Sequence, residues 1–109
     1  MINQKIQILD STLREGEQTP GVSFSISQKI EILKMLNSFG VDFIEIGHPV
    51  VSTDIYSFIK NISKMKLRSK VIAHSRLLKK DIDNVIELNI PWVGLFFDIC
   101  ERHLEKKYG

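Results

Sequence analysis

Cysteine, long apolar segments and excess charge are all scarce in this chain of 109 residues. Its single cysteine, Cys100, excludes an internal disulfide and fits a reducing cytosol. No apolar run approaches the ~20 residues of a membrane-spanning helix. The first five residues lead directly into an apolar segment and lack the features of a signal peptide. We therefore predict a cytoplasmic protein that has no membrane partner.

The charge balance also excludes a partner class. A net charge of +2 is too small to indicate a nucleic-acid-binding protein. Hydrophobic content of 43% and charged content of 26% are typical of an ordinary globular domain. The most basic segment is predicted to be a solvated helix end and loop, and its basic residues are Lys60, Lys64, Lys66, Arg68 and Lys70.

Short apolar runs alternate with segments of helical periodicity, which indicates βα units and a parallel sheet. Ser25 and Gln28 form a capping box for a helix of about fourteen residues, and Gly40 follows that helix as its left-handed end. Ser52 caps a second helix. The apolar positions of the first helix are Ile26, Ile30, Leu33, Leu36 and Phe39. The predicted strands are 5–9, 41–46, 71–73 and 92–97, with a third helix near 82–88 and the start of a fourth after residue 98.

A dense polar stretch follows the first predicted strand. Arg14 and Glu15 are adjacent, so both side chains can reach one pocket, where a carboxylate suits a divalent cation and a guanidinium suits a developing oxyanion. Asp10 is expected to pair with Arg14 and fix its direction. The alternative is a solvated turn with incidental ion pairs.

The stretch resembles the motif of a known family. Its nine residues, Asp10-Ser11-Thr12-Leu13-Arg14-Glu15-Gly16-Glu17-Gln18, match without exception the end of the first strand in metal-dependent, aldolase-like TIM barrels. That family, also described as pyruvate carboxyltransferase or HMGL-like, includes homocitrate synthase, 2-isopropylmalate synthase, citramalate synthase and hydroxymethylglutaryl-CoA lyase. The resemblance covers essentially the whole chain.

The resemblance implies roles for individual residues. Glu15 would be a ligand of a divalent metal (Mg, Mn or Zn), Arg14 would be the catalytic residue that stabilises the enolate of acetyl-CoA, and Gln18 would lie close to the substrate. The reaction would be a Claisen condensation of acetyl-CoA with a 2-oxo acid. His74, in Ala73-His74-Ser75-Arg76, resembles the homocitrate synthase pattern, which favours 2-oxoglutarate as the acid and lysine biosynthesis as the pathway.

Polar residues recur where predicted strands end, which is the active-site rim of a parallel barrel. We expect Arg14, Gln18, Glu45 and His74 to contact substrate there. Glu45 is included because a carboxylate in an otherwise apolar strand is costly to bury without a partner. The other residues at this rim are Asp10, Glu15, His48, Ser75, Arg76 and Asp98.

The chain is too short for the complete fold. A closed (β/α)8 barrel needs about 250 residues, so residues 1–109 are expected to be the truncated N-terminal half of one, with about four βα units. The family's remaining metal ligands lie in a His-x-His motif, which this sequence lacks. We therefore expect these residues alone to be inactive and the full-length enzyme to be a homodimer.

Three alternatives stay open. The acid could be 2-oxoisovalerate or pyruvate, as in 2-isopropylmalate and citramalate synthases of leucine and isoleucine biosynthesis. The chain could be a non-catalytic truncated remnant that folds only against a partner. Two copies could also pair, because the first and fourth strands would each present an unpaired apolar edge.

Overall fold

The computed structural model describes residues 4–97 and shows a parallel α/β arrangement. Four strands, β1 (Leu9–Asp10), β2 (Phe43–Gly47), β3 (Lys70–Arg76) and β4 (Trp92–Phe96), form one sheet in the order β1-β2-β3-β4. Every neighbouring pair is parallel. This is the succession of βα units expected for part of a (β/α)8 barrel. The predicted fourth helix lies outside the described residues.

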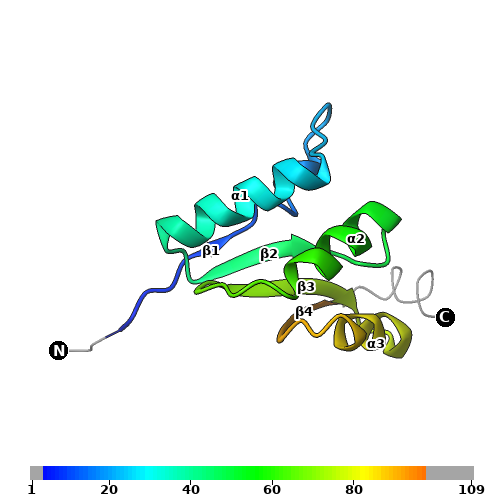
Figure 1. The fold of residues 1–109 in the computed structure, drawn as a ribbon. Coiled ribbons are helices and arrows are strands. Elements are labelled where there is room, and N and C mark those ends of the chain that lie inside the picture. Colours follow the sequence, from blue (N-terminus) through cyan, green and yellow to red (C-terminus); the bar gives the residue numbers. More distant parts are fainter. Residues whose placement is uncertain (1–3, 98–109) are drawn as a thin grey trace.

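Three α-helices connect the strands. They are α1 (Ile26–Phe39), α2 (Thr53–Ile62) and α3 (Lys79–Glu87), and a short 3-10 helix, η1 (Gly16–Gln18), interrupts the loop after β1. Figure 1 shows α1 and α2 side by side along the sheet, with α3 at the end that carries β4. Short crossovers of this kind keep the carboxyl ends of all four strands at one rim.

Local capping explains where α1 begins and ends. The Ser25 hydroxyl accepts a hydrogen bond from the Gln28 N–H, while the Gln28 side chain accepts one from the Ser25 N–H. Gly40 ends the helix with a φ of 96°, which a side chain would resist. Ser52 caps α2 in the same way through the Ile55 N–H. The predicted capping box, helix length and left-handed glycine are all confirmed.

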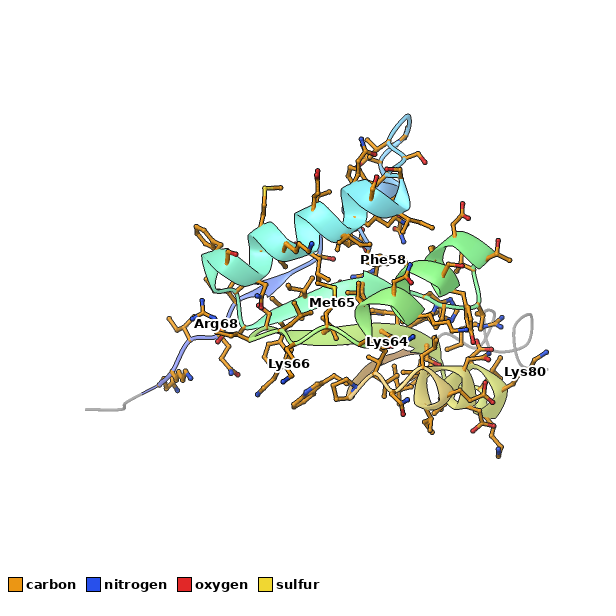
Figure 2. The ribbon with its side chains drawn as sticks, in the orientation of Figure 1. Phe58, Lys64, Met65, Lys66, Arg68 and Lys80 are labelled. Carbon is orange, nitrogen blue, oxygen red and sulfur yellow. The ribbon has the colours of Figure 1, made fainter. Side chains whose placement is uncertain are left out.

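The core lies between the sheet and the helices. Phe58 and Ile59 of α2, Leu33 of α1 and Ile44 of β2 are each fully buried. Phe58 projects from α2 on the side of α1 (Figure 2). Alternation along the strands sends Glu45 and His74 to the opposite face from Ile44 and Ala73. The polar residues therefore reach the rim on the face away from the helices.

Some predicted boundaries and burials are wrong. The first strand is only Leu9–Asp10, shorter than the predicted 5–9. Among the described strands it has β2 as its sole neighbour, and the residues before Leu9 are exposed. Phe39 is 83% exposed. Leu33, Leu36 and Phe39 are three residues apart, and at 3.6 residues per turn each such step rotates the side chain by about 60°. Phe39 therefore lies well away from the apolar face that Leu33 occupies.

The outermost strand is also more exposed than expected. Trp92, Val93, Leu95 and Phe96 are between 40% and 46% exposed, although a strand buried on both faces was predicted. In residues 4–97, β4 pairs with β3 alone, so its other edge faces solvent. The expected unpaired apolar edge is therefore present.

The basic segment is exposed as predicted. Lys64, Lys66 and Arg68 follow α2 on the way to β3 (Figure 2), and Lys60 and Lys70 at either end of this stretch are exposed too. No helix in the described part of the chain is both long and apolar enough to cross a membrane.

Candidate active site at the carboxyl ends of the strands

A cleft of about 660 Å³ lies at the carboxyl ends of the four strands. One wall comes from the loop after β1, and the other walls come from the ends of β2, β3 and β4 and from α2. Its lining residues are Leu13, Arg14, Glu15, Glu17, Gln18, Gly47, His48, Val51, Ile55, His74 and Phe96. Four of the five predicted site residues, Arg14, Glu15, Gln18 and His74, thus line one cleft.

The loop after β1 turns sharply to present its side chains. The N–H groups of Arg14, Glu15 and Gly16 all converge on the carbonyl of Ser11. Leu13 is 2% exposed, so it anchors the loop in the core while Arg14 faces the cleft. A buried leucine next to an arginine therefore decides which way the loop faces.

Arg14 is held by carboxylates. Its Nε donates to Glu45 Oε2 over 2.5 Å, and its Nη1 donates to Glu15 Oε1 over 2.7 Å. The expected pair with Asp10 is wrong: Asp10 Oδ1 accepts from the N–H of Thr12 and stays with its own turn. The short aspartate is used locally, while the longer Glu45 reaches across from β2.

Glu45 is the hub of the network. It is 7% exposed, and Arg14 and the Ser11 hydroxyl both donate to its Oε2. Its Oε1 lies 3.1 Å from His74 Nε2. The carboxylate therefore joins β2 to the loop and to β3, and it stands behind the residues that line the cleft.

The network determines the charge of Glu45. Burial raises the pKa of Glu45, whereas hydrogen bonds from Arg14 and Ser11 and the proximity of His74 lower it. The lowering effects together outweigh burial, so the pKa of Glu45 lies below its ordinary value. The hydrogen bond to Glu45 raises the pKa of Arg14. Both groups are charged at neutral pH, and the guanidinium is a fixed positive charge in the cleft wall.

The described residues do not form a metal site. Glu15 is the carboxylate of the motif that lines the cleft next to Arg14, with a side chain 58% exposed, and it pairs with Arg14. Residues 4–97 hold no group of three or more His, Cys, Asp or Glu side chains placed to bind an ion. A hard cation wants about six oxygen ligands, so Glu15 could supply only one of them.

Gly94 makes room for His74. The two residues are register partners on β3 and β4, and a Cβ at position 94 would lie 3.2 Å from both Cε1 and Nε2 of His74. Such contacts are tighter than most real Cβ contacts, so the imidazole would have to shift by a few tenths of an ångström. The missing Cβ of Gly94 therefore leaves room beside β4 for the His74 ring, which lies 3.1 Å from Glu45.

Replacing Gly94 with alanine is expected to displace His74 from Glu45 and to reduce the free energy of unfolding by about 1–3 kcal/mol, the usual cost of overpacking. Urea denaturation measures this change. In a His74→Ala background the same replacement should cost much less, because the clashing ring is gone. An equal cost in both backgrounds would contradict the contact.

A second ionic cluster borders the cleft. Asp81, in the first turn of α3, is 3% exposed and accepts from Arg76 Nε over 2.6 Å and from Nη2 over 3.2 Å. His48 Nε2 lies 3.6 Å from Asp81 Oδ2, beyond hydrogen-bonding distance, and this buried nitrogen has no hydrogen-bond partner among residues 4–97. The His48 and His74 rings both lie against Phe96, with centroids 5.7 and 6.2 Å away.

Stability should fall on mild acidification because of His48. Burial lowers the pKa of His48, the nearby Asp81 raises it, and the net pKa lies below the ordinary 6.5. The unfolded chain therefore takes up a proton before the folded chain does, so the free energy of unfolding declines as pH drops below about 6.5. Urea denaturation at about pH 7.5 and 5.5 measures the decline. It should shrink in His48→Asn, and equal stability of the parent chain at both pH values would contradict it.

The sequence did not reveal several residues of this site. Ser11 as a donor to Glu45 and Gly94 as the space for His74 depend on strand register, and Asp81 as the partner of Arg76 depends on the turn from β3 into α3. Only Ser11 lay within the motif. Asp98, predicted at the end of β4, lies outside the described residues.

Comparison with known proteins agrees with this geometry. The chain is 50% identical to the homocitrate synthase of Sulfurisphaera tokodaii over 108 residues, which are 95% of this chain and 24% of that protein. It is 52% identical to the homocitrate synthase of Pyrococcus horikoshii over 101 residues, or 93% of this chain and 28% of that protein. The homocitrate synthase of Saccharolobus islandicus is 48% identical over 95% of the chain.

The chain thus spans about a quarter of the length of the curated relatives it matches. The family model described as HMGL-like matches residues 5–109, which include the motif, the cleft and all four strands. The chain belongs to the HMGL-like family.

Proposed function

We propose that this chain forms the N-terminal part of an acyltransferase that condenses acetyl-CoA with 2-oxoglutarate to give homocitrate in lysine biosynthesis. The observation that supports this most is the cleft that gathers Arg14, Gln18 and His74 at the carboxyl ends of the strands. The similarity to three homocitrate synthases agrees with it. The partners are small molecules, and the proposed location is the cytoplasm.

Arg14 supplies the main electrostatic contribution. Deprotonation of the acetyl-CoA methyl group places negative charge on the thioester oxygen, and a preorganised cation stabilises this enolate. Within residues 4–97, Arg14 uses Nε and Nη1 for its carboxylate partners, which leaves its Nη2 hydrogens for that oxygen. Glu45 keeps the guanidinium from turning away when the cleft is empty. The methyl carbon then bonds to the keto carbon of the acid, and hydrolysis of the thioester releases CoA.

His74 and Gln18 are proposed to bind the 2-oxo acid. His74 is half-buried near the end of β3, and Gln18 is exposed in the loop that forms another wall of the same cleft. A polar imidazole at this place suits the second carboxylate of 2-oxoglutarate better than the branched apolar tail of 2-oxoisovalerate. His74 therefore favours homocitrate over 2-isopropylmalate or citramalate as the product.

A divalent metal, Mg, Mn or Zn, is proposed for the complete enzyme, with Glu15 as its ligand from this chain. The described residues do not complete such a site, so the isolated chain should bind Mn²⁺ weakly and show no turnover. We also propose that the complete enzyme is a homodimer. CoA release by the isolated 109 residues in the presence of both substrates would contradict the incomplete site.

A chimaera tests the proposal. In it, this chain replaces the matching 101 residues of the Pyrococcus horikoshii homocitrate synthase, to which it is 52% identical. The chimaera should release CoA from acetyl-CoA with 2-oxoglutarate and much less with 2-oxoisovalerate or pyruvate. A preference for either of the latter two acids would overturn the substrate assignment. A folded chimaera inactive with all three would favour a non-catalytic remnant.

A further inference from the structure

Lys29 is a buried charge that the proposed chemistry does not use. It lies in the first turns of α1 and is only 4% exposed. It follows Ile26 by three residues and precedes Leu33 by four, so it lies on the apolar stripe of the helix. Burying an ammonium group among apolar side chains costs free energy unless a partner compensates its charge. The groups around Lys29 therefore indicate why it is buried.

The partner comes from the motif loop. Lys29 Nζ lies 2.8 Å from Glu17 Oε2, and the same nitrogen lies 5.7 Å from the centre of the Phe58 ring. The ammonium is thus placed between an anion and the face of an aromatic ring, and both attract it. Three separate segments, namely the loop, α1 and α2, meet at this one charge.

Glu17 also closes the loop on itself. Its Oε1 accepts a hydrogen bond from the Phe24 N–H over 3.3 Å, seven residues along the chain. Gln18 and Thr19 donate their N–H groups to the carbonyls of Glu15 and Gly16, which forms η1. The carboxylate of Glu17 therefore connects the η1 turn to the residue from which the chain enters α1.

Besides the bonds of Ser11 and Arg14 to Glu45, the loop has two attachments of different kinds. Leu13 buries its first half in the core, and the ion pair of Glu17 with Lys29 fastens its second half to α1. Arg14 and Glu15 stand between these two attachments, and Gln18 follows Glu17 directly. If the second attachment were released, the residues between Glu15 and Phe24 would be free to move away from the cleft.

We propose that Lys29 is a positioning residue, whose buried ion pair with Glu17 sets the η1 loop so that Arg14, Glu15 and Gln18 face the cleft. It touches no reacting atom and acts through the loop. A positioning role for Lys29 rests on the proposed function of those three side chains. The attachment of the loop to α1 rests only on the ion pair of Lys29 with Glu17.

Hydrogen exchange of the 109-residue chain, followed by NMR, tests the proposal. Lys29→Met removes the charge and keeps most of the volume. The amides of Gln18, Thr19 and Val22, which are hydrogen-bonded within the loop, should then exchange at least ten times faster, while buried amides of α2 should change much less. The side-chain Nε–H of Arg14 should exchange faster as well, since its bond to Glu45 depends on the loop.

Lys79→Met is the matched control. It breaks an exposed lysine–aspartate pair, between Lys79 and Asp83 of α3, and should leave loop exchange unchanged. Glu17→Gln is the second variant if Lys29→Met fails to fold, because its amide oxygen can still accept from the Phe24 N–H. Glu17→Gln should accelerate the same amides, and combining it with Lys29→Met should accelerate them no further than the stronger single variant.

Three results would overturn the proposal: unchanged loop exchange in the charge-removing variant, equal acceleration in the loop and α2, or purely additive effects in the double variant. None of these readouts depends on turnover. An inactive chimaera with a normally protected loop would count against the proposed function alone, while an active chimaera that carries Lys29→Met with unchanged kcat and KM would count against positioning alone.

Discussion

Replacing Arg14 with lysine is expected to lower kcat of the chimaera with 2-oxoglutarate by about 100- to 1,000-fold, the usual effect of removing one oxyanion donor. Lysine keeps the positive charge but lacks the planar guanidinium. The guanidinium can bond Glu45 and Glu15 through two nitrogens and still offer its third nitrogen to the substrate. Because the enolate exists only after deprotonation, the loss should fall on kcat more than on KM. Steady-state CoA release measures both constants.

Arg68→Lys is the control for this replacement. Arg68 is exposed on the segment before β3, far from the motif in sequence, and its replacement should leave kcat within a factor of two. If Arg14→Lys folds correctly and lowers kcat by less than tenfold, the result would contradict the proposed role of Arg14 in stabilising the transition state.

Replacing Phe58 with alanine is expected to lower the free energy of unfolding by about 3–5 kcal/mol. Phe58 is fully buried between the helix layer and the sheet, and its ring face is also in contact range of the Lys29 ammonium. The variant therefore loses apolar burial and one attraction on a buried charge. Since small domains have only about 5–15 kcal/mol of total stability, this loss is a large fraction of it.

Phe39→Ala is the matched control for Phe58. It removes the same atoms at the end of α1, where the side chain is 83% exposed, and should change stability by no more than about 0.5 kcal/mol. Urea denaturation monitored by circular dichroism compares the two variants. Similar losses at both positions would contradict the placement of the core on the α2 side of the sheet.

Local chemistry explains what the sequence predicted well. Ser25, Gln28 and Gly40 specify α1 through hydrogen bonds and backbone angles that involve only near neighbours, so its fourteen residues were predicted correctly. The parallel order of the strands followed from the alternation of elements, because a βα unit has one favoured way to return to the sheet.

The site was predicted less completely because it depends on register. That Arg14, Glu15, Gln18 and His74 share a cleft followed from their positions at strand ends. That Arg14 pairs with Glu45 instead of Asp10 depends on a separation of 31 residues, which no local pattern encodes. Lys29 was detectable in principle, since it interrupts an apolar stripe, but its partner Glu17 was not.

The exposed apolar edge of β4 also depends on which strands lie beside it. The sequence of β4 predicts a strand buried on both faces, and the described residues provide it with one neighbouring strand. A strand that is apolar on both sides and open at one edge readily pairs with further strands. This agrees with the proposal that the complete enzyme has more βα units than the four strands described here.

The exchange rate of the Arg14 Nε–H by NMR tests most directly the claim that Glu45 fixes the Arg14 guanidinium at the rim of the sheet. The account predicts that this proton exchanges at least ten times more slowly than the Nε–H of the exposed Arg68, and that Glu45→Gln removes the difference, whereas Glu31→Gln on the exposed side of α1 does not. An Arg14 proton that exchanges as fast as that of Arg68 in the parent chain would contradict it.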